Sequence, residues 1–255
     1  MADDSRSPEK RFSDRVDNYV RYRPSYPIEI IDILQQEAGL NPESVVADIG
    51  AGTGIFSELL LQHGYKVTGV EPNDGMRNAA ARLLAPYPQF TSVKGTAETT
   101  TLAGTSVDLI VAAQAFHWFK AGPTRHEFSR ILKPQGKIAL IWNVRRVDST
   151  PFLRAYENLL LKHATDYSQV RHENIGTDEL RGFFEGGSYI TCKVPNGQSF
   201  DLEGLSGRLL SSSYAPAKGQ RGHEAMMTDL TDIFERHQSD GQVRFEYDTE
   251  IYIGS

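Results

Sequence analysis

The sequence predicts an α/β fold in which parallel strands alternate with helices. Short apolar runs, which are typical of buried parallel strands, recur at residues 45–49, 65–70, 90–93 and 106–113. Segments in which apolar residues repeat with helical spacing follow most of these runs. A glycine-rich turn joins the first run to the first helix. In a parallel sheet, such a turn predicts a ligand site at the carboxyl ends of the strands.

The glycine-rich turn lies within Val45–Leu61, whose sequence is VVADIGAGTGIFSELLL. Its glycines, spaced two residues apart, allow a tight turn and leave no Cβ between the backbone and a ligand. A dinucleotide fingerprint, G-x-G-x-x-G, would need a glycine at position 55, which is Ile55 here. The turn has the pattern D-x-G-x-G-x-G instead, and it begins at Asp48.

A second acidic residue stands at the end of the next predicted strand. Tyr65–Val70 is followed directly by Glu71, seventeen residues after Gly54. A carboxylate has two oxygens that can accept from both hydroxyls of a ribose. The two motifs together favour a nucleoside-containing ligand.

Composition and charge narrow the class of protein. The chain has 255 residues, which is enough for a self-supporting core, and its net charge of −6 argues against a nucleic-acid partner. Its one cysteine, Cys192, excludes an intramolecular disulfide and fits a reducing compartment. The N-terminus is too charged for a secretory signal, and no apolar run reaches 18 residues. We therefore expect a cytoplasmic protein with no membrane partner. The seven histidines show no metal-ligand spacing, so no metal is expected.

The segments DIGAGTG and VTGVEP resemble the cofactor-binding motifs of class I S-adenosylmethionine-dependent methyltransferases. RILKPQGKIALI, at residues 130–141, is similar to the last core motif of that family. The resemblance extends from Tyr19 to about Asn143 and is closest to the small-molecule group that includes trans-aconitate methyltransferase-like proteins. It implies a Rossmann-like, mostly parallel sheet of seven strands with an antiparallel last strand, helices on both faces, and helical cap insertions.

We expect one domain over residues 1–255. Residues 1–40 would form N-terminal cover helices, the first from Phe12 to Val20; residues 41–143 would form the cofactor-binding core; and residues 144–255 would form the last strands and the substrate-cap helices. Within these parts the pattern predicts a helix at 125–133 before a strand at 137–143, late helices at 151–164, 202–210 and 224–237, and late strands at 189–194 and 243–253.

The resemblance implies S-adenosylmethionine as the methyl donor, S-adenosylhomocysteine as the product, and a cofactor site formed by Tyr19, Arg23, Asp48, Gly50, Ala51, Gly52, Thr53, Gly54, Glu71, Pro72, Met76, Ala97, Glu98 and Gln114. In it Arg23 would pair with the methionine carboxylate, unless it is a surface arginine. Met76 would lie against the adenine, unless it serves core packing. The Ala97 amide would donate to the adenine ring. Whether Thr96 or Glu98 takes the exocyclic amine stays open.

The acceptor would lie against residues that the resemblance places beside the methyl group. In QAFHWF, at residues 114–119, two aromatic rings and an imidazole follow the fourth strand. The predicted substrate pocket comprises Tyr22, His117, Trp118 and Tyr214. His117 is the candidate catalytic base, or it only shapes the pocket. The group implies a small acid or a similar acceptor, and the sequence shows no obvious cationic cluster for a tricarboxylate beyond Arg23, Arg145, Arg146 and Arg208.

Three other functions compete with a small-molecule methyltransferase. The chain could bind S-adenosylmethionine and act by interaction alone, could methylate RNA or protein, or could be a nicotinamide oxidoreductase. A [DN]PP[YF] motif, typical of many nucleic-acid amino-methyltransferases, is absent after the fourth predicted strand, where the sequence reads AAQAFHWF. The intact motif set favours catalysis. The sequence leaves a monomer and a homodimer equally open.

Overall fold

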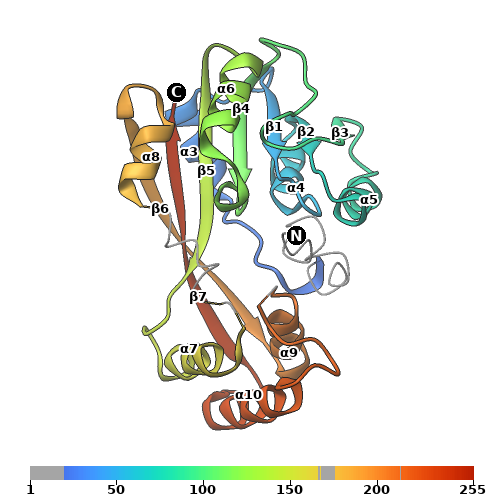
Figure 1. The fold of residues 1–255 in the computed structure, drawn as a ribbon, viewed down its shortest axis with the longest axis vertical. Helices are drawn as coiled ribbons and strands as arrows, with labels where there is room; N and C mark the ends of the chain where they lie inside the picture. Colours follow the sequence, from blue (N-terminus) through green and yellow to red (C-terminus); the bar gives the residue numbers. More distant parts are fainter. Residues whose placement is uncertain (1–19, 166, 168–175, 213) are drawn as a thin grey trace, which may run out of the picture.

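The computed structural model of the chain describes residues 20–165, 167, 176–212 and 214–255. It contains a seven-stranded sheet with helices on both sides (Figure 1). Most of the predicted helix Phe12–Val20 lies outside the described residues, which begin with a helical stretch at 20–22. Among the described helices, none has the length and apolar character needed to cross a membrane.

The strands lie in the order β3-β2-β1-β4-β5-β7-β6. Their bounds are β1 Val45–Ile49, β2 Lys66–Val70, β3 Phe90–Val93, β4 Val107–Ala113, β5 Leu132–Arg145, β6 Tyr189–Phe200 and β7 Val243–Gly254. Strands β1 to β5 pair in parallel, whereas β7 lies between β5 and β6 and is antiparallel to both. The predicted sheet, with an antiparallel last strand inserted into it, is confirmed.

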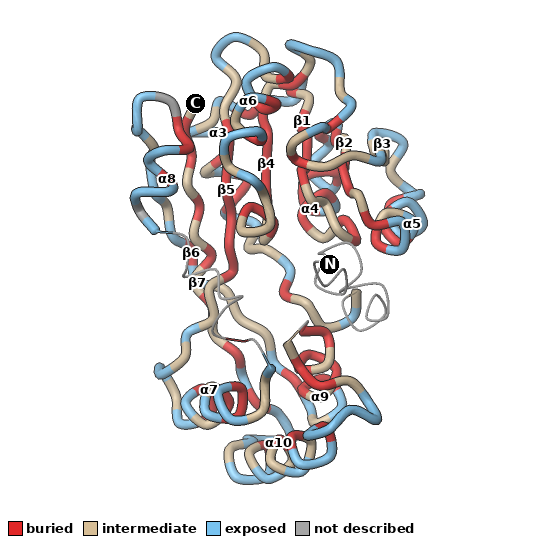
Figure 2. Tube along the Cα trace, viewed as in Figure 1, coloured by how far each residue is buried: buried red, intermediate tan, exposed pale blue. Residues whose placement is uncertain are grey.

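Two hydrophobic clusters fill the two sides of the sheet. Helices α3 (Glu29–Ala38) and α4 (Ile55–Gln62) pack on one side, and α6 (Ala121–Ile131) and α8 (Thr177–Phe183) pack on the other. The remaining described helices are α5 (Asp74–Leu83), the short 3-10 helices η3 (Phe116–Trp118) and η5 (Glu185–Gly187), α7 (Pro151–His163), α9 (Leu202–Leu210) and α10 (His223–His237). Figure 2 shows the buried residues running along the central strands between these layers. The prediction that helices cover both faces of the sheet is therefore confirmed.

Side chains just before the helices explain why several of them begin where they do. The side chain of Asn73 accepts from the amide of Met76 at the start of α5, at 2.9 Å. Thr150 does the same for Leu153 in α7, where proline occupies the first turn. Asp201 caps α9 at 2.8 Å. Each cap satisfies an amide that the helix itself leaves without a partner.

A second lobe is built on the far ends of the longest strands. Beyond the core sheet, β6 and β7 continue together and carry α7, α9 and α10, which pack around a third hydrophobic cluster (Figure 1). We call these three helices and the strand ends beneath them the distal lobe. Phe245, Tyr156 and Leu205 are fully buried at its centre. The distal lobe contains the late helices that the sequence predicts as cap insertions.

The bounds predicted for two strands are wrong. The strand expected at 137–143 begins at Leu132, because Leu132 already pairs with Val107 before a bulge over residues 133–136, where Gln135 has φ +69°. The preceding helix accordingly spans Ala121–Ile131 and not 125–133. The strand expected to stop at Val194 continues to Phe200 through Pro195. Proline has no backbone N–H to donate to a neighbouring strand. It is tolerated in β6 because β6 is the edge strand, which has no neighbour on its open side.

Candidate functional site

One cavity of about 670 Å³ lies at the carboxyl ends of β1, β2, β4 and β5 and reaches the distal lobe. Its volume is within the range of ~300–1,000 Å³ that is usual for small-molecule sites. The predicted cofactor residues that line it are Arg23, Asp48, Gly50, Ala51, Gly52, Thr53, Glu71, Pro72, Met76, Ala97, Glu98 and Gln114. The lining also includes three of the predicted acceptor residues, His117, Trp118 and Tyr214.

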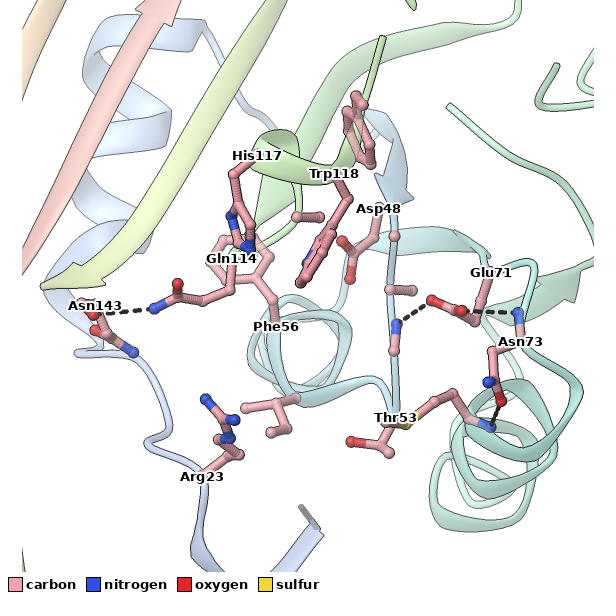
Figure 3. A pocket seen from close by; sticks show the side chains of 18 of the residues that line it. Arg23, Asp48, Thr53, Phe56, Glu71, Asn73, Gln114, His117, Trp118 and Asn143 are labelled. Carbon is pink, nitrogen blue, oxygen red and sulfur yellow. Dashed lines mark hydrogen bonds between the residues drawn. The ribbon is translucent and has the colours of Figure 1, made fainter. Parts of the chain in front are cut away.

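The glycine turn and Glu71 form one hydrogen-bonded unit. The amide of Gly52 donates to Glu71 Oε2 and the amide of Asn73 donates to Oε1, both at 2.9 Å (Figure 3). Gly52 has φ +58°, and a Cβ there would meet no atom within 4 Å, so this stretch of backbone is exposed to the cavity. Each carboxylate oxygen can accept more than one hydrogen bond, so the fixed Glu71 carboxylate can also accept from a ligand.

Gly50 and Gly54 serve the packing of the turn. A Cβ on Gly50, which has φ +73°, would lie 2.6 Å from the Cβ of Ala115. A Cβ on Gly54 would lie 2.6 Å from Leu84 Cδ1, between α4 and the end of α5. Gly50 also borders the cavity, whereas Gly54 does not line it. The structure therefore places Gly54 where close helix contact requires glycine.

Asp48 is a buried carboxyl group at the end of β1, with 1% of its surface exposed. Burial raises the pKa of Asp48 to about 7, against the hydrogen bond from Ser57 and together with the nearby charge of Glu71. Ser57 Oγ donates to Oδ2 at 2.7 Å, and Oδ1 has no partner among the described residues. A buried carboxylate oxygen without a partner is an acceptor site for a cationic group of a ligand.

The segment after β3 has the geometry of a narrow loop. Ala97 is 3% exposed and lies in the cavity wall. The carboxylate of Glu98 accepts from the backbone amide of Lys120 at 3.0 Å. Burial raises the pKa of Glu98, but this bond, its own amide and the Thr96 hydroxyl outweigh that effect and lower it overall. Met76 is 4% exposed and lines the same end. These residues form a partly apolar part of the cavity wall that includes a hydrogen-bonded carboxylate.

The end of β4 is shaped by a strained glutamine and a single helical turn. Gln114 has φ +58°, and its Nε2 donates to the carbonyl of Asn143 at 3.1 Å. His117 and Trp118 project from η3 toward the cavity, with ring centroids 4.9 Å apart (Figure 3). Phe116 turns the other way and is buried against Phe183. The strain at Gln114 directs a polar side chain into the wall beside the two rings.

The N-terminal segment crosses the cavity mouth and joins its two ends. Asn143 Nδ2 and Asn196 Nδ2 both donate to the carbonyl of Ser25, at 3.2 and 2.8 Å. Arg23 lines the cavity, and its Nη2 donates to the carbonyl of Ser211 at the end of α9 at 3.0 Å. The segment predicted as a cover is therefore tied to both the core sheet and the distal lobe.

One predicted acceptor residue lies away from the cavity, and one predicted cofactor residue is not among the described residues. Tyr22 does not line the cavity; its ring packs on α9, where a Cβ on Gly207 would lie 2.0 Å from Tyr22 Cε2. It also meets the ring of Phe200 edge-on, with centroids 6.4 Å apart. Tyr22 thus belongs to the core of the distal lobe. Tyr19 lies outside the described residues.

The structure adds lining residues that the sequence analysis did not single out, namely Tyr26, Phe56, Asn73, Asn143, Tyr167 and Tyr247. Asn143 ends the predicted fifth strand, and a polar residue at the carboxyl end of a parallel strand is the signal that could have found it. Arg145 and Arg208, named only as candidate cations, also line the cavity, whereas Arg146 pairs outside it with Asp248 at 2.7 Å. In the described part of the chain, no group of His, Cys, Asp and Glu residues is placed to hold a metal ion.

Comparisons with known proteins agree with this geometry. Residues 47–140 match the family model of a methyltransferase domain. An uncharacterized methyltransferase-like protein of Schizosaccharomyces pombe is 29% identical over 248 residues, covering 95% of this chain and 94% of that protein. An uncharacterized methyltransferase of Mycobacterium bovis is 40% identical over 134 residues, about half the length of each chain.

A solved structure shares the fold. It is that of a candidate type II methyltransferase from Anaeromyxobacter dehalogenans, with a TM-score of 0.68 and 22% identity, covering 91% of this chain and 97% of that one. The chain therefore contains a methyltransferase domain, which runs from the glycine turn to the middle of β5, and with β7 inserted antiparallel beside β5 it shares its fold with methyltransferase structures.

Proposed function

We propose that this methyltransferase uses S-adenosylmethionine to methylate a small molecule, with a carboxylic acid as the favoured class of acceptor. The observation that carries the proposal is a single cavity with an acidic, glycine-lined end and an aromatic end. The acidic end comprises Asp48, Glu71 and Glu98. The aromatic end comprises His117 and Trp118 beside Gln114.

The residues at the acidic end fit the cofactor. Asp48 Oδ1 is a buried acceptor without a described partner, which suits a cationic group. Glu71 is fixed by two backbone amides and retains lone pairs for the ribose hydroxyls. The part of the cavity wall formed by Met76, Ala97 and Glu98 suits a flat purine with an exocyclic amine. Arg23 lies at the cavity mouth as the partner for the methionine carboxylate.

The task of the protein is then alignment more than acid catalysis. When bound, S-adenosylmethionine supplies an electrophilic methyl group on a sulfonium sulfur and leaves as a neutral thioether. Gln114, fixed by Asn143, and the rings of η3 hold an acceptor atom on the open side of the cofactor site and exclude water. An acceptor that must lose a proton would transfer it to His117, whereas a carboxylate needs no base.

The arrangement favours a small acceptor over RNA or a protein. The aromatic end of the cavity is lined by η3, by residues 23, 24 and 26 and by the distal lobe, so that a ligand has walls on several sides rather than a flat surface. The chain also carries a net charge of −6, which disfavours a polyanionic backbone. We propose that the cover segment, the core and the distal lobe act as one catalytic unit.

The proposal is tested by a screen of small acids, phenols and amines with S-adenosylmethionine that is isotopically labelled in the methyl group. We expect labelled product with at least one small acceptor. With that acceptor, His117→Ala is expected to raise KM or lower kcat by about tenfold or more, since a pocket wall or a base is lost. His126→Ala is the control, because His126 is exposed on α6. Unchanged KM and kcat in His117→Ala would remove His117 from the site. Tight cofactor binding with no transfer to any acceptor would favour a binding protein.

A further inference from the structure

Acidic and basic residues line different parts of the cavity. Asp48 lies at the end of β1, and Glu71 and Glu98 follow β2 and β3, whereas Arg145 and Arg208 line the end beneath the distal lobe. The direction from one end to the other can be followed along a single strand, β5.

On β5, two lining residues give the spacing. Asn143 holds Gln114 at the core end of the cavity, and Arg145 is two residues further on. Residues i and i+2 of a strand point to the same side, about 7 Å apart at ~3.3 Å per residue. Arg146, the residue after Arg145, does not line the cavity and pairs with Asp248 instead. Arg145 is paired across the sheet with Tyr247, which also lines the cavity. The basic end therefore begins about 7 Å beyond the Gln114–Asn143 contact, toward the distal lobe.

Arg208 enters this end from α9 and is buried, with 7% of its surface exposed. Its Nε donates to the hydroxyl of Tyr247 at 3.4 Å and its Nη1 to Ser212 Oγ at 3.2 Å. Its guanidinium carbon lies 6.0 Å from the centre of the Phe245 ring. No carboxylate of the described residues forms an ion pair with it. A buried guanidinium whose neighbours are neutral hydroxyls and rings has lost its hydration without gaining a counter-charge.

Arg145 is different, because its charge is balanced. It pairs with Glu157, and its Nη2 donates to the hydroxyl of Tyr167 at 2.9 Å. Its guanidinium lies 5.1 Å from the centre of the Tyr156 ring. Its Nη1, however, is buried without a partner among the described residues. The basic end thus combines one uncompensated positive charge, on Arg208, with a free donor on Arg145.

We propose that Arg208, together with Arg145 Nη1, binds a carboxylate of the acceptor that is not the methylated group. This inference rests on the proposed function and specifies its acceptor. A single uncompensated guanidinium matches a monoanion, and its planar fork matches a carboxylate. A carboxylate bound to a guanidinium is a weaker nucleophile than a free one. It would also lie two residues further along β5 than the wall beside His117. The acceptor therefore carries two groups: a carboxylate anchor and a separate atom that takes the methyl.

The experiment is calorimetric titration of the protein saturated with S-adenosylhomocysteine. The probes are glutarate, benzoate and 4-hydroxybenzoate, the corresponding primary amides, and inorganic phosphate. We expect at least one carboxylate to bind at least tenfold more tightly than its amide, as charge-assisted hydrogen bonds to a buried guanidinium require. We expect phosphate to bind more weakly than that carboxylate.

Two variants and a matched control locate the effect. Arg208→Met is expected to weaken carboxylate binding at least tenfold and to leave S-adenosylhomocysteine binding within about twofold, since Arg208 is at the other end of the cavity. Arg208→Lys keeps the charge but not the fork and is expected to be intermediate. It also serves if Arg208→Met does not fold. Arg146→Met removes the arginine that directly follows β5 and lies outside the cavity, and this variant should bind carboxylates as the unaltered protein does.

Several results would overturn the subsite. A carboxylate and its amide could bind equally well, or carboxylate binding could survive both Arg208 substitutions. Phosphate could bind more tightly than any carboxylate, or no carboxylate could bind while S-adenosylhomocysteine does. If S-adenosylhomocysteine itself does not bind, the proposed function fails. The same carboxylate titrations without it then still decide whether Arg208 holds an anion.

Discussion

Replacement of Glu71 by alanine is expected to weaken binding of S-adenosylhomocysteine by about 100-fold or more, because two charge-assisted hydrogen bonds to the ribose are lost together. The same change leaves the amides of Gly52 and Asn73 without the acceptor that holds the glycine turn against the end of β2. The measurement is calorimetric titration of each variant, with circular dichroism to show that the fold is kept.

Two further variants separate the charge from its surroundings. Glu71→Gln retains one acceptor oxygen and is expected to lose about tenfold in affinity, between the native protein and Glu71→Ala. Asp74→Asn is the control, since Asp74 is exposed, three residues further on, and lies outside the cavity. If Glu71→Ala bound S-adenosylhomocysteine within a few-fold of the native protein, the ribose would not lie on this carboxylate.

Cofactor binding is expected to tighten by about tenfold between pH 6 and pH 8 through Asp48. Burial raises the pKa of Asp48 to about 7, so the carboxyl group of the free protein is largely protonated at pH 6 and largely ionised at pH 8. A cationic group of the cofactor favours the ionised form, and binding below pH 7 therefore releases a proton. Titration of S-adenosylhomocysteine over this range, in two buffers of different ionisation enthalpy, measures both the affinity and the proton released.

The same group acts in the opposite direction on the stability of the free protein. Its folded pKa is raised above the ordinary value of 3.8, so the unfolded chain loses this proton at lower pH than the folded chain does. The contribution of Asp48 to stability therefore falls as pH rises from about 4 to about 7. In Asp48→Asn, both the pH dependence of binding and this loss of stability should flatten. A native protein whose affinity is constant from pH 6 to pH 8 would contradict the assignment.

The core of the fold and the position of the cavity were predictable because the signals are local. Asp48, the glycines and Glu71 lie within a few residues of the strands that position them, and parallel pairing brings the ends of β1 and β2 together. Gly52 and Glu71, nineteen residues apart, are joined by a hydrogen bond between the two motifs. Alternation of apolar and polar residues likewise gives β7, whose inward side is buried along its length.

The basic end of the cavity could not be predicted in the same way, because it depends on contacts between distant segments. Arg145 and Arg208 line one cavity only because β6 and β7 run past the core and α9 packs in the distal lobe that they carry. Tyr22 was predicted to line the substrate pocket because it is next to Arg23 in the sequence. Its ring packs in the distal lobe instead, because Gly207, 185 residues later, leaves space for it. No local pattern around Tyr22 distinguishes these two positions.

The central claim is that the cleft at the ends of β1 and β2 binds an adenosyl methyl donor. Its most direct test is calorimetric titration of the unaltered protein with S-adenosylhomocysteine and, separately, with NAD. We predict one S-adenosylhomocysteine bound per chain and no heat of binding from NAD. Binding of NAD without binding of S-adenosylhomocysteine, or binding of neither, would contradict the claim.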